Sequence, residues 1–250
     1  MPASIWLPAA CFLTAFAYAT VGLAGGSTYL ALLALAGMPH ESMRVTALAL
    51  NLIVSAGGFF HFARAGHVRW RLLVPFSIAS IPASYLAART PLSARVFFAL
   101  LAASLLLVGV RMLFWRESVI RPRPMAWSMA WRWGPWLGAA LGALAGFVGI
   151  GGGIFLGPVL ILLGWADGKR AAAAASGFIL LNSAAGLIAH VQNGNLPAAG
   201  PVVPLAAAVF VGGQLGSLAG ARGLTARRLE QIFGVFVLSV AGQAAYRAFA

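Results

Sequence analysis

The sequence is poor in acidic residues, with 4 Asp and Glu against 17 Lys and Arg in 250 residues. Transporters of metal cations and hydrolases both place carboxylates at their membrane-embedded sites. The four acids fall at predicted loops or helix ends: Glu41, Glu117, Asp167 and Glu230. Their positions argue against a divalent-metal transporter, against a hydrolase or other membrane enzyme, and against proton coupling through a carboxylate.

Cysteine is also scarce. The single residue, Cys11, excludes an internal disulfide and a multi-cysteine metal site, and we expect neither a metal nor a cofactor. No basic segment precedes the first apolar run, so residues 5–21 are expected to be a mature helix rather than a cleaved signal.

Hydrophobic residues are abundant instead, at 61% of the chain, with 8% charged residues and a mean hydropathy of +0.91. This composition is typical of a protein that crosses the membrane many times. The basic residues lie in short loops between apolar runs, where headgroups and topology explain them, so nucleic-acid binding is rejected.

The apolar runs predict an all-α polytopic membrane protein. The expected helices are 5–21, 26–37, 43–63, 72–88, 94–115, 133–148, 152–165, 170–192, 198–221 and 226–248. A polar linker at 116–132 separates a first membrane repeat, 1–115, from a second, 133–250.

One apolar stretch is too long for a single crossing. From Trp133 to Trp165 it has 33 residues, about 50 Å as one helix against a hydrocarbon slab of roughly 30 Å. The glycines at 149 and 151–153 therefore mark a break in the helix. Broken helices at membrane depth occur where the backbone lines a cavity, and in transporters they sit at substrate sites.

The two halves resemble each other in order. Val21–Gly26 aligns with Val148–Gly153, and the later matches are Asn51 with Asn182, Pro75 with Pro204, and Leu92–Arg95 with Leu224–Arg227. The matched order predicts a duplication. The alternative is chance similarity between apolar helices of low complexity.

Charge favours a hairpin in the first segment of each half. If 5–37 and 133–165 turn back at their glycines, 13 of the 17 basic residues share one side of the membrane; the other four are Arg44, Arg89, Arg95 and Arg247. If both segments cross, the basic residues divide almost evenly. Because cytoplasmic loops carry excess Lys and Arg, we expect inverted repeats with the linker inside and both termini outside.

The glycine breaks also create a candidate anion site. Each opens a half-helix whose first N–H groups lack partners and whose dipole is positive, so two such ends meeting at mid-membrane would bind a small oxyanion. The predicted substrate-binding residues are Gly25, Gly26, Ser27, Thr28, Thr46, Asn51, Gly149, Gly151, Gly152, Gly153, Ser176 and Asn182.

Structural roles are the alternatives for these residues. Glycine runs also serve close helix packing, and Asn51 and Asn182 can bond neighbouring helices. The hydroxyl groups of Thr46 and Ser176 can instead bond their own helix backbone.

Three further polar residues have expected structural roles. Gln214 is expected to bond between helices. His61 and His190, near helix ends, are expected to make interfacial hydrogen bonds, with proton transfer as the alternative.

The chain resembles the sulfite exporter TauE/SafE family of bacterial membrane transporters. The resemblance is carried by Gly146–Gly153 with Pro158, by its fainter copy at Val21–Gly26, by the loop Arg64–Arg71 and by the start of helix 170–192. It covers essentially the whole chain.

The resemblance implies secondary transport of small sulfur-containing anions such as sulfite or sulfonates, with export the expected direction, across a bacterial inner membrane. We expect alternating access, in which one repeat rocks against the other. An anion channel, or transport of a different small solute, is the alternative. Small-residue faces on 198–221 and 226–248 permit a homodimer.

The predicted topology can be tested with a reporter fused after Ala250. Because both termini are expected outside, a reporter enzyme that works only in the cytoplasm should be inactive at this position. Reporter activity in intact cells is the measurement, and an active fusion refutes the hairpin topology.

Overall fold

The computed structural model describes residues 6–114, 125–194 and 199–223, together with 235, 238, 241–246 and 248. This part of the chain contains helices and no strand, which confirms the all-α prediction. The helices are α1 (Trp6–Ala19), α2 (Gly26–Leu35), α3 (His40–Arg64), α4 (Trp70–Arg89), α5 (Ala94–Phe114), α6 (Trp127–Val148), α7 (Gly153–Leu162), α8 (Gly168–Gln192) and α9 (Ala199–Arg222).

Four segments in the described part are long and apolar enough to cross a membrane: His40–Arg64, Trp70–Arg89, Gly168–Gln192 and Val202–Arg222. Shorter apolar helices accompany them. The chain is thus a multi-pass membrane protein.

The helix boundaries agree with the sequence prediction within a few residues, except at α6. It begins at Trp127 rather than at residue 133, so the last residues of the predicted linker 116–132 are helical. Residues 127–132 contain neither proline nor glycine, and their exposed Trp127 and Trp131 suit a membrane interface. The predicted helix 226–248 lies largely outside the described residues, and the domain boundaries stay predictions.

Both predicted breaks are present. α1 ends at Ala19 and α2 begins at Gly26, while α6 ends at Val148 and α7 begins at Gly153. The residues that precede α2 and α7 are Gly25, with a φ of 94°, and Gly152, with a φ of 71°. Side chains other than hydrogen strongly disfavour this left-handed conformation, which explains why glycine occupies both positions.

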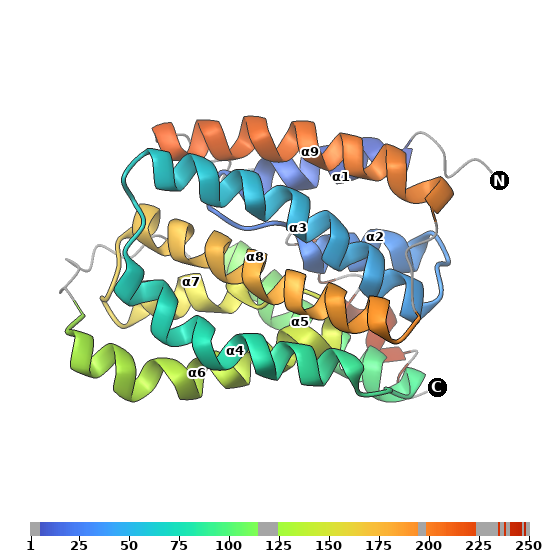
Figure 1. The fold of residues 1–250 in the computed structure, drawn as a ribbon. Helices are drawn as coiled ribbons and strands as arrows, with labels where there is room; N and C mark the ends of the chain where they lie inside the picture. The colour runs from blue at the N-terminus through green and yellow to red at the C-terminus, as the bar shows by residue number, and fades with distance from the viewer. Residues whose placement is uncertain are drawn as a thin grey trace.

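The chain folds back at each break. A methyl group added at Gly25 would lie 2.7 Å from Cγ2 of Thr14, and one added at Gly152 would lie 3.0 Å from the carbonyl oxygen of Leu141. Residues eleven positions apart would be roughly 16 Å apart in an unbroken helix. In Figure 1, α2 returns to the right end, where α1 begins, and α7 returns to the left end, where α6 begins. The same spacing in both hairpins fits the predicted duplication, which stays a prediction.

The hairpins give the bundle one strongly basic end. α3 ends there with Arg64, α4 begins there after Arg69, and α8 begins there with Lys169 and Arg170. This basic end is on the left in Figure 1, and the opposite end, where α3 begins and α8 ends, is on the right. The helix directions therefore match the hairpin model of the topology. That the basic end faces the cytoplasm stays a prediction.

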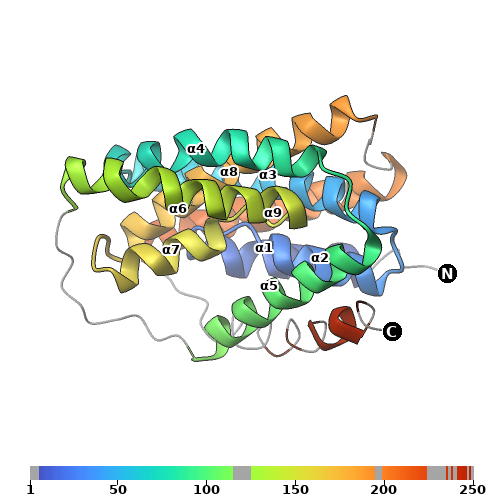
Figure 2. The same ribbon diagram turned by 90° about the horizontal axis from the view of Figure 1, so that it is seen from below.

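Glycines on α6 allow it to pack directly against the backbone of α4. A methyl group at Gly138 would overlap the carbonyl oxygen of Phe76, and one at Gly142 would lie 2.6 Å from Cα of Ser80. Figure 2 shows the two helices side by side along most of their length. Small residues at four-residue spacing permit this close approach.

Glycines on α9 likewise allow it to pack directly against the backbone of α1. Gly212, Gly216 and Gly220 of α9 face the backbone carbonyl groups of Phe12, Phe16 and Thr20. These contacts occupy one small-residue face of α9, and the homodimer stays a prediction. Each glycine-lined contact connects a helix of the first half to a helix of the second.

The helices form two layers in Figure 1, with α1, α2, α3 and α9 above and α4, α6, α7 and α8 below. α3 and α8 pack against each other where the layers meet. Both carry residues of the predicted site, Asn51 on α3 and Asn182 on α8. The site therefore lies between the layers.

The α4–α6 contact predicts unequal effects of two alanine substitutions. Gly138→Ala should lower the free energy of unfolding by about 1–3 kcal/mol, because the methyl group overlaps backbone that cannot give way. Gly157→Ala on α7 is the matched control, since its methyl group would lie 3.7 Å from Cβ of Ala175. Thermal unfolding in detergent compares the variants, and equal melting temperatures would contradict the close contact.

Candidate functional site

Asn51 connects the two glycine breaks. It lies on α3 and is fully buried, yet Nδ2 and Oδ1 have no hydrogen-bond partner in the described chain. A methyl group at Gly26 would overlap Nδ2 and lie 2.8 Å from Oδ1, while one at Gly151 would lie 3.3 Å from Nδ2. A buried amide without a partner costs free energy, so its place between the breaks indicates a ligand or water.

The helices that begin at the breaks present uncapped amino termini. Their preceding residues, Gly25 and Gly152, provide no side-chain hydrogen bond. By contrast, α8 begins with Asp167, whose carboxylate accepts a 2.8 Å bond from the N–H of Arg170. In α7 the N–H groups of Gly153 and Phe155 donate to the carbonyls of Gly151 and Gly152 at 2.9 and 3.1 Å. The remaining first-turn N–H groups, those of residues 26–28 on α2 and of Ile154 on α7, and the positive dipole ends are available to an anion.

Two buried hydroxyl groups add to this region. Oγ of Ser27, in the first turn of α2, has no hydrogen-bond partner among the described residues, and neither does Oγ of Ser183 on α8. Ser183 lies at the second break, where its Oγ would be 3.0 Å from a methyl group at Gly151. The sequence analysis missed Ser183, because its approach to Gly151 is a contact between segments far apart in the sequence.

Asn182 is partly committed to its own helix. Its Nδ2 donates a 2.8 Å bond to the carbonyl of Phe178, while its buried Oδ1 has no partner in the described chain. Ser176 bonds its own helix too, through a 3.0 Å bond to the carbonyl of Ala173. The structural alternative thus accounts for the hydroxyl group of Ser176.

Two predicted threonines also have partners. Oγ1 of Thr28 lies 2.7 Å from the hydroxyl group of Tyr18, which ties the two arms of the first hairpin together. Oγ1 of Thr46 lies 3.9 Å from Sδ of Met38. No contact in the described chain brings Thr46 to either break.

The predicted glycines divide into three groups. Gly26 and Gly151 face Asn51, whereas Gly149 approaches Cα of Arg44 at 3.3 Å and Gly153 approaches the carbonyl oxygen of Ala175 at 2.5 Å, both distances measured from an added methyl group. Gly25 and Gly152 supply the turn conformation. The runs therefore combine helix packing with access to Asn51.

Arg44 differs from its sequence interpretation. The sequence places it near the start of the predicted helix 43–63, as one of four basic residues on one side of the membrane, but it is only 1% exposed within α3. Its Nη2 donates a 3.1 Å bond to the carbonyl of Gly146 on α6. The contact spans 102 residues, so a reading of local patterns could not reveal it.

The expectation for Gln214 is confirmed, since its Oε1 lies 2.8 Å from Nε2 of His61, a contact between α9 and α3.

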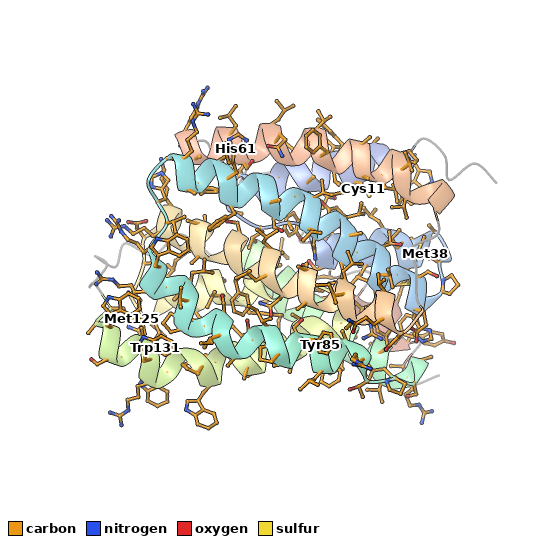
Figure 3. The ribbon with its side chains drawn as sticks, viewed as in Figure 1. Cys11, Met38, His61, Tyr85, Met125 and Trp131 are labelled. Atoms are coloured by element: carbon orange, nitrogen blue, oxygen red, sulfur yellow. The ribbon has the colours of Figure 1, made fainter. Side chains whose placement is uncertain are left out.

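The prediction for His190 is wrong, because it is 1% exposed and neither ring nitrogen has a partner in the described chain. Figure 3 shows His61 near the basic end of the bundle and Tyr85 nearer the opposite end. At that end the hydroxyl group of Tyr85 on α4 donates a hydrogen bond to Oε1 of Gln192 on α8.

Comparison with known proteins adds to this geometry. A family model described as sulfite exporter TauE/SafE matches residues 7–244. The chain belongs to this family. A TauE/SafE-type membrane transporter therefore accounts for the broken helices and the buried polar groups between them.

A curated relative agrees with the TauE/SafE assignment. The probable membrane transporter protein y4hK of Sinorhizobium fredii (strain NBRC 101917 / NGR234) is 38% identical over 242 residues, which cover 94% of this chain and 95% of the relative. No solved structure matches the chain.

Because the amide of Asn51 has no hydrogen-bond partner in the described chain, we expect its replacement to impair ligand binding without lowering the stability of the fold. Asn51→Leu, which preserves shape, should leave the free energy of unfolding unchanged or raise it, because no protein hydrogen bond is lost. Asn182→Leu is the matched control and should lower it by about 1 kcal/mol, because its bond to Phe178 is lost. Thermal unfolding in detergent measures both. A larger loss in Asn51→Leu would show that Asn51 holds the fold together.

Proposed function

We propose that the protein exports a small sulfur-containing oxyanion, such as sulfite or a sulfonate, across a bacterial inner membrane. The observation that carries the proposal is the unpaired amide of Asn51 between Gly26 and Gly151. An anion there would accept hydrogen bonds from Nδ2, from the first N–H groups of α2 and from the N–H of Ile154 on α7. The glycines let its oxygen atoms approach the backbone.

Neutral donors suit a transported anion. Hydrogen bonds from amide, hydroxyl and backbone N–H groups replace part of the anion's hydration shell without a fixed opposite charge that would hold it tightly. Ser27 and Ser183 supply further hydroxyl groups, each buried and without a partner in the described chain. The choice of a sulfur oxyanion rests on the family, since phosphate or carboxylate would use the same donors.

Alternating access would expose this site first to one end of the bundle and then to the other. The contact between α3 and α8, where the two layers meet, is the natural place for the relative movement. The glycine-lined pairs α4–α6 and α1–α9 would each move as a unit, because side chains cannot slide past such close backbone contacts. Each moving unit then contains helices from both halves of the chain, rather than one repeat.

The membrane potential can drive export by itself. An inside-negative potential favours outward movement of an anion by about 2.3 kcal/mol per charge per 100 mV. The described helices carry no carboxylate near the breaks to couple a proton, since Glu41 begins α3 and Asp167 precedes α8. Uncoupled export is consistent with these residues.

Sulfite efflux from proteoliposomes tests the proposal. The wild type should release trapped sulfite at a saturable rate, faster when the potential favours anion exit. Asn51→Leu should reduce the rate about 10- to 100-fold, the value of a hydrogen bond to a charged group. Gly157→Ala is the folded control and should transport normally.

Substrate competition and electrical recording complete this test. Thiosulfate, sulfonates, sulfate, phosphate and chloride are added as competitors, and only the sulfur anions should inhibit. Normal sulfite efflux in folded Asn51→Leu would refute the site. A flux that never saturates, with resolvable single-channel currents, would replace the transporter by an anion channel.

A further inference from the structure

Arg44 is a buried cation with incomplete compensation. Its one described hydrogen bond goes from Nη2 to the carbonyl of Gly146, near the carboxyl end of α6, and its buried Nε has no partner. The partial negative charge of a helix carboxyl end offsets about half of a unit charge. A buried guanidinium group normally has an anionic partner as well.

The acids in the described chain do not provide that partner. Glu41 lies on the same helix but pairs with His40 at 3.3 Å, and Asp167 pairs with Arg170 at the basic end. Glu41 is also partly exposed and makes no ion pair with Arg44. Glu41, three residues before Arg44 on α3, lies within electrostatic range of it but does not contact it, so the buried Nε of Arg44 has no anionic partner in the described chain.

His190 adds a second unpartnered group to the same region. It is 1% exposed, and both Nδ1 and Nε2 lack hydrogen-bond partners in the described chain. It lies near the end of α8, which runs antiparallel to α3: a methyl group at Gly186 would lie 3.1 Å from Leu48, and one at Gly58 would lie 3.4 Å from Ser176. This register places His190 opposite Arg44. α3 begins and α8 ends at the same end of the bundle in Figure 1. A neutral imidazole presents one N–H donor, beside a guanidinium that presents its free Nε–H.

The two residues are displaced from Asn51 in the same direction. Arg44 precedes Asn51 by seven residues on α3, a rise of about 10 Å, and His190 follows Asn182 by eight residues on α8, about 12 Å. Both displacements lead toward the end opposite the basic end. Arg44 thus lies at the second break but on the far side of Asn51, since a methyl group at Gly149 would lie 3.3 Å from its Cα. His190 lies toward the same end of the bundle on α8.

We propose that Arg44 and His190 form a second binding site for a small oxyanion, between the Asn51 site and the end opposite the basic end. The anion accepts hydrogen bonds from Nε of Arg44 and from one ring nitrogen of His190. This inference rests on the proposed anion transport, to which it adds a charged site next to the neutral one. An anion leaving Asn51 moves toward a positive charge before it reaches water.

The imidazole signal of His190 reports binding at this second site. Purified protein with ¹⁵N-labelled histidine is titrated with sulfite under anaerobic conditions, and His190→Gln identifies the signal. Sulfite should shift the His190 resonances in the wild type, whereas sodium chloride at equal ionic strength should not. The same shift should persist in Asn51→Leu, because the two sites are separate, and disappear in Arg44→Gln.

Each other outcome overturns a defined part of the proposal. Unshifted His190 resonances in the wild type, or an equal shift in Arg44→Gln, refute the second site. A persistent shift together with normal efflux in Asn51→Leu refutes the central site alone. If sulfite shifts His190 in the wild type but not in folded Asn51→Leu, the two sites are not separate and the second site is rejected.

His190→Gln keeps the inference testable should Arg44→Gln fail to fold. The imidazole makes no hydrogen bond in the described chain, so its replacement should preserve the melting temperature. Sulfite efflux should then fall about tenfold, the lower value for a lost hydrogen bond to an anion. Wild-type efflux kinetics in this variant would refute a role for His190.

Discussion

Backbone polar groups cannot remain unsatisfied inside a bilayer, and the structure is organised around two places where that rule is strained. At each break a helix stops at glycine, turns back and begins again without a side-chain cap. Gly26 and Gly151 of the two breaks approach the buried amide of Asn51, which has no hydrogen-bond partner in the described chain. Polar groups without hydrogen-bond partners make such turns costly in an ordinary core. At these breaks the same groups can bind a solute.

The distribution of charge follows a related logic. Most basic residues of the described chain lie at helix ends, where headgroups and water solvate them, while the region around Asn51 contains only neutral donors. Arg44 is the exception, because it is buried on α3 and donates a hydrogen bond to the carbonyl of Gly146 near the carboxyl end of α6. Arg44 precedes Asn51 by seven residues on α3, a rise of about 10 Å. The positive charge therefore lies nearer one end of the bundle than the neutral donors around Asn51 do.

Features encoded along the chain could be predicted from the sequence. The breaks follow from the length of an apolar stretch and its glycines, and the return of both hairpins follows from the placement of Lys and Arg. Asn51 could be proposed because it recurs as Asn182 in the second half. Contacts between distant helices could not be predicted, and for this reason the burial of Arg44 against Gly146 and the approach of Ser183 to Gly151 were missed.

The glycine-lined pairs bear on how the protein is assembled. α4 meets α6 soon after both have been synthesised, but α1 packs against α9, whose residues follow almost two hundred positions later. Until then the contact face of α1 has no permanent partner, and it must rest against lipid or a helper protein in the membrane. α1 therefore reaches its final packing only after α9 has been synthesised.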